Sequence, residues 1–235
     1  MIPRELIDEA PIPGGGTLRL IRRGADYSIM LGANELMNSR LSGSEEALAT
    51  LAWERMAERT QPAVLIGGLG MGFTLRAALA RMGAQAQVTV AELVPAVIAW
   101  GRGPLAHIHG PSLSDPRLRI FEGDVAALIG SERQWDAILL DVDNGPDGIS
   151  QAANDGLYSL AGLRSAKRAL RPGGVYALWS SAPDRAFTQR LRKAGFDVDE
   201  VIVRANGGRG GARHTIWLAR PAAGDFAIAA RRRRT

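Results

Sequence analysis

The sequence predicts an α/β fold: a doubly wound, mostly parallel seven-stranded sheet with a C-terminal antiparallel hairpin and a small N-terminal β-hairpin. Five short β-like runs alternate with helical patterns, which is typical of parallel strands joined by helices. These runs lack strict polar alternation, which indicates a sheet covered on both faces. The last two runs follow each other without a helix and predict the closing hairpin. The seven runs are residues 64–66, 87–91, 118–121, 137–141, 175–179, 198–203 and 214–219.

The N-terminal part predicts a β-hairpin extension and linker over residues 1–43. Two β-like runs, residues 17–22 and 27–31, flank a short turn that contains glycine and aspartate. We therefore expect a small appendage to a main domain that covers residues 44–220.

A helix is expected between this appendage and the first strand of the main sheet. Ser44 is a suitable N-cap, and the acidic Glu45 and Glu46 favour the positive end of a helix. The apolar pattern continues to Arg59, and Pro62 ends it before the strand begins.

A glycine-rich turn follows the first strand of the main domain and indicates a site for a nucleotide-type cofactor. Gly68, Gly70 and Gly72 lead into a helix over residues 73–81, so the backbone can approach a ligand closely. Glu92 follows about twenty residues later at the end of the next strand, where an acid can accept both ribose hydroxyls. A tight turn without a ligand is the alternative, and the position of Glu92 disfavours it.

Polar residues follow four of the predicted strands, and their carboxyl ends form the ligand-binding edge of such a sheet. Asp124 is suited to an adenine amino group, with the Val125 N–H facing a ring nitrogen; it is also suited to be a helix N-cap, and the two roles are compatible. The cofactor candidates are Gly68, Gly70, Met71, Gly72, Glu92, Leu93, Gly123, Asp124, Val125 and Asp141. The substrate candidates are Asp143, Asn144 and Tyr158.

Composition excludes several classes of chemistry. The 235 residues include no cysteine, which removes disulfides, thiolate nucleophiles and cysteine-based metal sites. No apolar stretch reaches the length of a membrane span, and no secretion signal is evident, so we expect a cytoplasmic protein without a membrane partner. The net charge of +5 is concentrated in the tail over residues 221–235, which we expect to be solvated and disordered rather than bound to nucleic acid.

The order of motifs resembles the class I S-adenosylmethionine-dependent methyltransferase fold, and within it the spermidine synthase family. The resemblance extends from about Tyr27 to Ala219. Besides the glycine turn and Glu92, it rests on Asp115-Pro116-Arg117, Gly123-Asp124, Asp136-Ala137-Ile138-Leu139-Leu140-Asp141, Leu157-Tyr158-Ser159 and Leu170-Arg171-Pro172-Gly173-Gly174. The resemblance implies an S-adenosylmethionine or decarboxylated S-adenosylmethionine cofactor, a small-molecule acceptor and a homodimer. It also implies that Asp141 is the base, with Asp143 and Asn144 beside it in the catalytic stretch. The alternative is that Asp141 and Asp143 are strand-end polar residues or part of a turn.

The sequence departs from the family pattern at positions that bear on the reaction. Met71 stands where the family has the acid that holds the donor amine, and Asn144 replaces the second catalytic acid. Residues 28–43 contain neither the glutamine nor the tyrosine of the family. Methyl transfer is therefore our first hypothesis and aminopropyl transfer the alternative. A third hypothesis is an adenosyl-ligand-binding protein that has lost catalysis.

Other functions are less well supported by the sequence. A dehydrogenase would explain the glycine turn but not Gly123-Asp124 and the closing hairpin. No metal site is expected: His107 and His109 fall in a glycine- and proline-containing connection and are assigned to a loop. Asp141 and Asp143 offer too few oxygen ligands for magnesium. The glycine-rich segment 206–211 is expected to be a hairpin loop rather than an RNA-binding segment.

Overall fold

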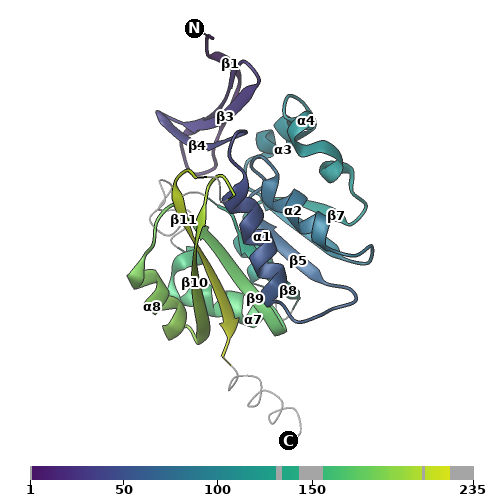
Figure 1. Cartoon of the computed structure of the whole chain (residues 1–235), viewed down its shortest axis with the longest axis vertical. Helices are drawn as coiled ribbons and strands as arrows, with labels where there is room; N and C mark the ends of the chain where they lie inside the picture. Colours follow the sequence, from purple (N-terminus) through teal and green to yellow (C-terminus); the bar gives the residue numbers. More distant parts are fainter. Residues whose placement is uncertain (1, 131–133, 143–155, 208–209, 223–235) are drawn as a thin grey trace, which may run out of the picture.

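The chain forms two sheets in the computed structural model, which describes residues 2–130, 134–142, 156–207 and 210–222. The small sheet lies at one end of the main sheet, and the C-terminal strand leads to the opposite end of the molecule (Figure 1). A long apolar cluster runs from the small sheet into the main one, so the two share part of a core.

The main sheet has seven strands in the order β10-β11-β9-β8-β5-β6-β7. The central strands are parallel, whereas β11 runs antiparallel to both β9 and β10. This confirms the predicted parallel sheet and its closing hairpin. The strands are β5 (Ala63–Gly67), β6 (Gln87–Glu92), β7 (Leu118–Glu122), β8 (Trp135–Leu140), β9 (Leu170–Ser180), β10 (Phe196–Arg204) and β11 (Arg213–Pro221).

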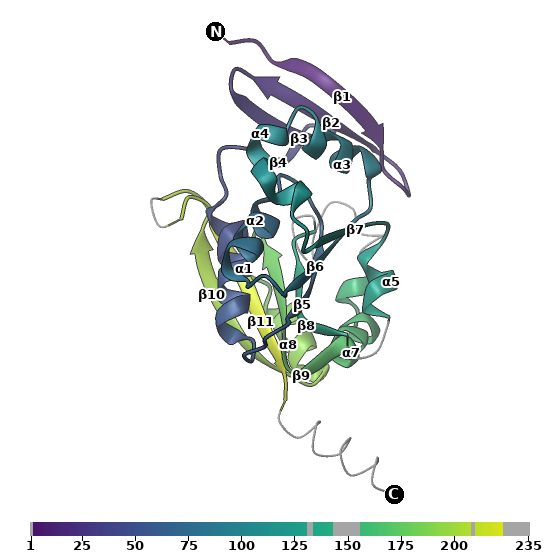
Figure 2. The same ribbon diagram turned by 90° about the vertical axis from the view of Figure 1, so that its right-hand side faces the viewer.

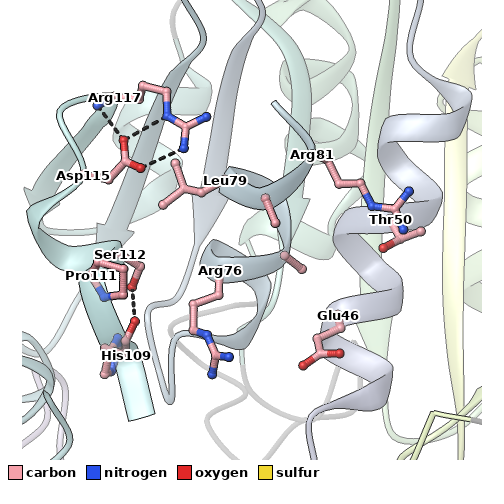
Figure 3. Close-up of a pocket in the computed structure, with 12 residues that line it drawn as sticks. Glu46, Thr50, Arg76, Leu79, Arg81, His109, Pro111, Ser112, Asp115 and Arg117 are labelled. Carbon is pink, nitrogen blue, oxygen red and sulfur yellow. Dashed lines mark hydrogen bonds and ion pairs between the residues drawn. The ribbon is translucent and has the colours of Figure 1, made fainter. Parts of the chain in front are cut away.

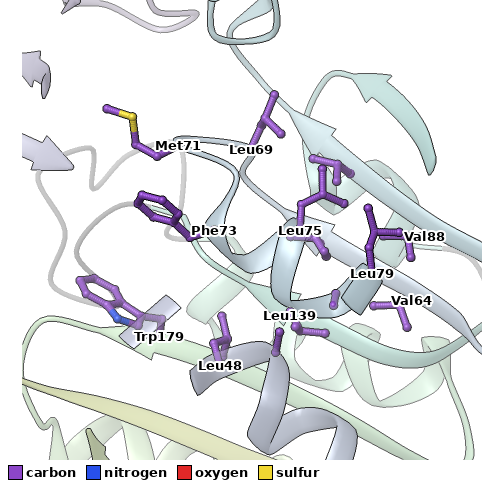
Figure 4. Packing of buried hydrophobic residues seen from close by; sticks show 14 of the residues in the cluster. Leu48, Val64, Leu69, Met71, Phe73, Leu75, Leu79, Val88, Leu139 and Trp179 are labelled. Atoms are coloured by element: carbon purple, nitrogen blue, oxygen red, sulfur yellow. The ribbon is translucent and has the colours of Figure 1, made fainter. Parts of the chain in front are cut away.

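Helices cover both faces of this sheet. Successive side chains of a strand point to opposite faces, so the buried strands contribute to two apolar clusters, one on each face. On β8, Ala137 and Leu139 face one cluster, whereas Ile138 and Leu140 face the other. Figure 4 shows part of the first cluster, around the start of α2. The helices are α1 (Gly43–Arg55), α2 (Phe73–Arg81), α3 (Pro95–Arg102), α4 (Ala106–His109), the 3-10 helix η1 (Gly110–Ser114), α5 (Val125–Ile129), α7 (Leu160–Ala169) and α8 (Arg185–Lys193).

The N-terminal sheet is larger than predicted. It contains four antiparallel strands, β1 (Glu5–Pro11), β2 (Thr17–Arg23), β3 (Asp26–Leu31) and β4 (Asn34–Asn38). The expected hairpin corresponds to β2 and β3. This sheet packs beside α3 and α4 (Figure 2), where the Trp100 Nε1 donates to Asp8 Oδ2 at 2.7 Å.

Two local predictions were wrong. Ser44 lies inside α1 rather than at its N-cap, which is Ser42, and the Ser44 hydroxyl donates to a neighbouring carboxylate instead. The connection that carries His107 and His109 is not a plain loop, because it forms α4 and η1. Among the helices in the described ranges, none combines the length and apolar composition that crossing a bilayer requires.

The start of β8 is fixed by a buried carboxylate. Asp136 is fully buried and accepts hydrogen bonds from Arg59 Nε at 2.9 Å, from an Arg171 guanidinium nitrogen at 2.8 Å and from the Ala63 N–H at 2.9 Å. It lies at the end of the strand opposite to Asp141. We therefore assign Asp136 a structural role that fixes β8 against β5.

Candidate functional site

The glycine turn is shaped by contacts with the protein itself. Gly68 has φ +90°, and a Cβ there would overlap the Asp141 carbonyl oxygen. Gly72 has φ +78°, and a Cβ there would overlap the His109 ring. The glycines were expected to let a ligand approach the backbone closely. In the structure, part of the space beside them is taken by the end of β8 and by α4. The glycines bring the turn against the end of β8, where Asp141 lies.

Glu92 ends β6 and is buried, with 8% of its surface exposed. Its two carboxylate oxygens accept the N–H groups of Leu69 at 2.8 Å and Val94 at 2.9 Å. Burial raises the pKa of Glu92, whereas these hydrogen bonds act to lower it. The side chain therefore holds the glycine turn in place, and each oxygen keeps acceptor capacity for a ribose hydroxyl. Leu93, the next residue, is half-buried.

Asp124 has the N-cap role that was foreseen. Its Oδ1 accepts the Ala126 N–H at 2.8 Å at the start of α5, and its side chain is exposed. The adjacent Gly123 donates its N–H to the Glu92 carbonyl oxygen at 2.8 Å, and Val125 is buried. The ends of β6 and β7 are thus joined. The exposed Asp124 carboxylate keeps acceptor capacity besides the Ala126 N–H.

Asp141 follows β8 and is the second acid of the strand ends whose pKa is raised. Thr74 Oγ1 donates to its Oδ2 at 2.6 Å. Burial, and then the charge of Glu45, raise the pKa of Asp141 to about 7, while the Thr74 hydrogen bond opposes the shift. A carboxyl group that changes protonation near neutral pH is suited to accept a proton in catalysis.

A small cavity, which we call the strand-end pocket, lies in front of Asp141. Its walls come from β4, α1, the glycine turn, the start of α2 and the end of β9. Met71, Phe73 and Trp179, which Figure 4 labels, contribute its apolar lining. The lining residues are Leu36, Met37, Glu45, Leu69, Gly70, Met71, Gly72, Phe73, Asp141 and Trp179.

Glu45 is a second acid in this pocket and was not predicted as a site residue. Its Oε2 accepts the Ser44 hydroxyl at 2.6 Å, and Ser44 Oγ lies 2.8 Å from His214 Nδ1 on β11. When Glu45 is ionised, it takes the single proton of Ser44, and His214 in its Nδ1–H tautomer then donates to the Ser44 oxygen. Burial raises the pKa of Glu45 and lowers the pKa of His214.

The remaining site predictions have different outcomes. Tyr158 is buried and packs edge-on against Phe187, with 5.6 Å between ring centroids, and its hydroxyl lies 3.5 Å from the Val142 carbonyl oxygen, one residue after Asp141. It does not line the strand-end pocket, and its role toward a substrate stays a prediction. Asp143 and Asn144 lie outside the described residues. His109 is fully buried, and burial together with Arg76 lowers its pKa to about 4, which keeps it neutral. No cluster suited to a metal ion occurs within the described ranges.

A larger hollow of about 520 Å³ lies on the outer side of α2, between α1 and η1 (Figure 3). Asp115 and Arg117 on its wall neutralise each other at 2.7 Å, and Glu46 and Arg76 also line it. None of the predicted cofactor residues does. We therefore place the functional site at the strand ends.

Sequence comparison relates the chain to polyamine aminopropyltransferases. The one of Streptomyces coelicolor is 35% identical over 123 residues, which are 51% of this chain and 22% of the relative. That of Nitrosomonas europaea is 37% identical over 98 residues, 41% of this chain and 29% of the relative. A polyamine aminopropyltransferase of Hyperthermus butylicus is 30% identical over 129 residues, which are 54% of this chain and 41% of the relative. The chain thus spans less than half the length of these relatives. No family model matches it.

Structure comparison covers much more of the chain. A spermidine synthase crystallised with the transition-state analogue AdoDATO superposes with a TM-score of 0.71 at 17% identity, covering 91% of this chain and 71% of that one. The spermidine synthase of Thermotoga maritima superposes with a TM-score of 0.71 at 18% identity, covering 91% of this chain and 72% of that one. The chain is therefore spermidine synthase-like: it has the class I methyltransferase-like fold of those enzymes and is similar in sequence to polyamine aminopropyltransferases.

Proposed function

We propose that this chain is a transferase that moves the aminopropyl group of decarboxylated S-adenosylmethionine to the amine of a small polyamine. The observation that carries the proposal is the Asp141 carboxylate, which lies between the glycine turn and the strand-end pocket. Its pKa of about 7 is that of a base that works near neutral pH. The similarity to polyamine aminopropyltransferases favours this hypothesis over methyl transfer, which the sequence alone had placed first.

The reaction requires that the acceptor amine lose a proton and that its nitrogen be aligned with the donor carbon. An acceptor ammonium gives a proton to Asp141, and the freed nitrogen lone pair attacks the donor carbon bound to the sulfonium. The carbon–nitrogen bond forms as the carbon–sulfur bond breaks, and its electron pair stays on sulfur in methylthioadenosine. Thr74 fixes the orientation of Asp141 through its hydroxyl at 2.6 Å. Positioning of donor and acceptor supplies much of the acceleration in such a displacement.

Three strand-end residues are suited to hold the adenosine part of the donor. Glu92 has acceptor capacity left for the ribose hydroxyls, and Asp124 presents an exposed carboxylate beside the Val125 N–H for the adenine edge. The glycine turn then passes along the side of the donor that carries the sulfonium. This assignment follows the usual position of ligands at the carboxyl ends of parallel strands.

Methyl transfer from S-adenosylmethionine is the second candidate, because Met71 offers no carboxylate to a donor ammonium. Calorimetric titration with S-adenosylmethionine, its decarboxylated form and methylthioadenosine separates the two. We expect the decarboxylated donor to bind more tightly than S-adenosylmethionine. The opposite order would overturn aminopropyl transfer in favour of methyl transfer, and no binding of any of the three would overturn both.

A further inference from the structure

The glycine turn carries a methionine at the position where an acid is expected, so a cationic substrate must find its counter-charge elsewhere. Met71 is 3% exposed and contributes an apolar wall to the strand-end pocket. An ammonium group that leaves water without a partner is strongly penalised. Any carboxylate that replaces the missing acid must therefore face the same pocket.

Glu45 on α1 meets this requirement. It lines the strand-end pocket together with Asp141, and no ion pair of either carboxylate occurs among the described residues. Thr74 on α2 bridges α1 and the end of β8, because its hydroxyl donates to Asp141 and lies 3.2 Å from the Glu45 carbonyl oxygen. Two neighbouring carboxylates without a cation make a half-buried site that attracts positive charge.

The rest of the pocket is suited to the alkyl chain that carries an ammonium group. Met71, Phe73 and Trp179 line it, and each is less than 10% exposed, so part of its wall is apolar. The pocket volume of about 40 Å³ suits a small group such as an alkylammonium end, not an adenosine.

The Glu45 carboxylate is held in this position from behind. Ser44 is fully buried and donates to Oε2 at 2.6 Å, and His214 on β11 lies 2.8 Å from Ser44. His214 in turn packs edge-on against Trp179, with ring centroids 4.7 Å apart. Ser44, whose hydroxyl orients the carboxylate, is thus itself held by a side chain of β11 that packs against β9.

We propose that Glu45 is a substrate-binding residue that holds a primary ammonium group in the strand-end pocket, in place of the acid that the glycine turn lacks. This inference rests on the proposed function. The ammonium comes either from the aminopropyl end of the donor or from the far end of a diamine acceptor. Both are the same chemical group, and the experiment distinguishes them.

The test is calorimetric titration of the wild type, Glu45→Gln and the matched control Glu46→Gln, whose side chain lines the hollow outside α2 instead. The ligands are methylthioadenosine, which has no ammonium group, decarboxylated S-adenosylmethionine, and 1,4-diaminobutane added to the methylthioadenosine complex. We expect Glu45→Gln to bind methylthioadenosine like the wild type and one ammonium ligand at least about tenfold more weakly. The ligand that is weakened identifies the source of the ammonium. Glu46→Gln should bind all three unchanged.

Equal affinity of Glu45→Gln and the wild type for both ammonium ligands would overturn the role of Glu45 while leaving the proposed function intact. Failure of the wild type to bind any adenosine ligand would instead overturn the proposed function. If Glu45→Gln does not fold, Ser44→Ala provides a second test, because it removes the hydroxyl that orients the carboxylate. It should weaken the binding of one ammonium ligand and leave methylthioadenosine binding unchanged. Unchanged binding of both ammonium ligands would overturn the proposal.

Discussion

Replacing Asp141 by asparagine should stabilise the folded chain at alkaline pH, although it removes the proposed base. Asparagine has nearly the same shape, and its carbonyl oxygen can still accept the Thr74 hydroxyl that lies 2.6 Å from the carboxylate. The change therefore removes the charge and keeps the hydrogen bond. Carboxylates kept buried without a cation commonly lower stability in exchange for function.

The size of the effect follows from the shift in pKa. Asp141 has a pKa of about 7 in the folded chain against an ordinary 3.8. A difference of about 3 units at 1.36 kcal/mol each corresponds to about 4 kcal/mol. Because the folded-state pKa is raised, the folded chain holds a proton that the unfolded chain releases between these values. The wild type should thus lose stability from about pH 4 to about pH 7, and the asparagine variant should not.

Urea unfolding at pH 5 and pH 8.5 measures this difference. Asp141→Asn should be more stable than the wild type by about 1.5 kcal/mol at pH 5, about one unit above the ordinary pKa, and by about 4 kcal/mol at pH 8.5, so the difference should grow by about 2.5 kcal/mol between the two pH values. Asp136→Asn is a suitable control, because Asp136 is paired with two arginines and its replacement should destabilise at both pH values. Equal or lower stability of Asp141→Asn at pH 8.5 would show that Asp141 does not carry a costly charge.

Three further substitutions test the surroundings of Asp141. Glu92→Ala should weaken methylthioadenosine binding at least about tenfold in calorimetry. It should also lower the free energy of unfolding in urea by about 2 kcal/mol or more, because the Leu69 and Val94 N–H groups lose their acceptor; unchanged stability would contradict these hydrogen bonds. Met71→Asp should increase the affinity for decarboxylated S-adenosylmethionine relative to S-adenosylmethionine by about tenfold in calorimetry, since it adds a carboxylate to the pocket; an unaltered ratio would mean that residue 71 does not face the donor amine. Gly68→Ala should lower the melting temperature sharply, because φ is +90° and the added Cβ meets the Asp141 carbonyl oxygen directly after β8. An unchanged melting temperature would contradict this packing.

The sheet could be predicted from the sequence because its strands are short apolar runs between glycine, proline and helical segments. The strands that escaped prediction are β1 and β4, whose side chains are mostly exposed or half-buried, so that no apolar pattern marks them. The segment around α4 was assigned to a loop on its glycines and proline. Its packing against the N-terminal sheet and the glycine turn favours a helix there, and such distant contacts leave no local pattern.

The strand-end residues could be predicted for the same reason, since parallel strands bring their carboxyl ends to one edge. Gly68, Glu92 and Asp141 do meet there. Glu45 and Trp179 could not be found this way. The helix dipole alone explains an acid such as Glu45 in the first turn of a helix, and a tryptophan such as Trp179 in an apolar run is assigned to the hydrophobic core. Their meeting depends on α1 packing over the ends of β9 and β11, which only the fold reveals.

Product analysis by mass spectrometry tests the proposed transfer most directly. The chain is incubated with decarboxylated S-adenosylmethionine or S-adenosylmethionine and a set of diamines and triamines, and both the amine and the adenosine product are identified. We expect an aminopropylated amine and methylthioadenosine from the decarboxylated donor, with turnover about 10²- to 10⁴-fold lower for Asp141→Asn. A methylated amine from S-adenosylmethionine, or no product from any amine although methylthioadenosine binds, would contradict the proposed transfer.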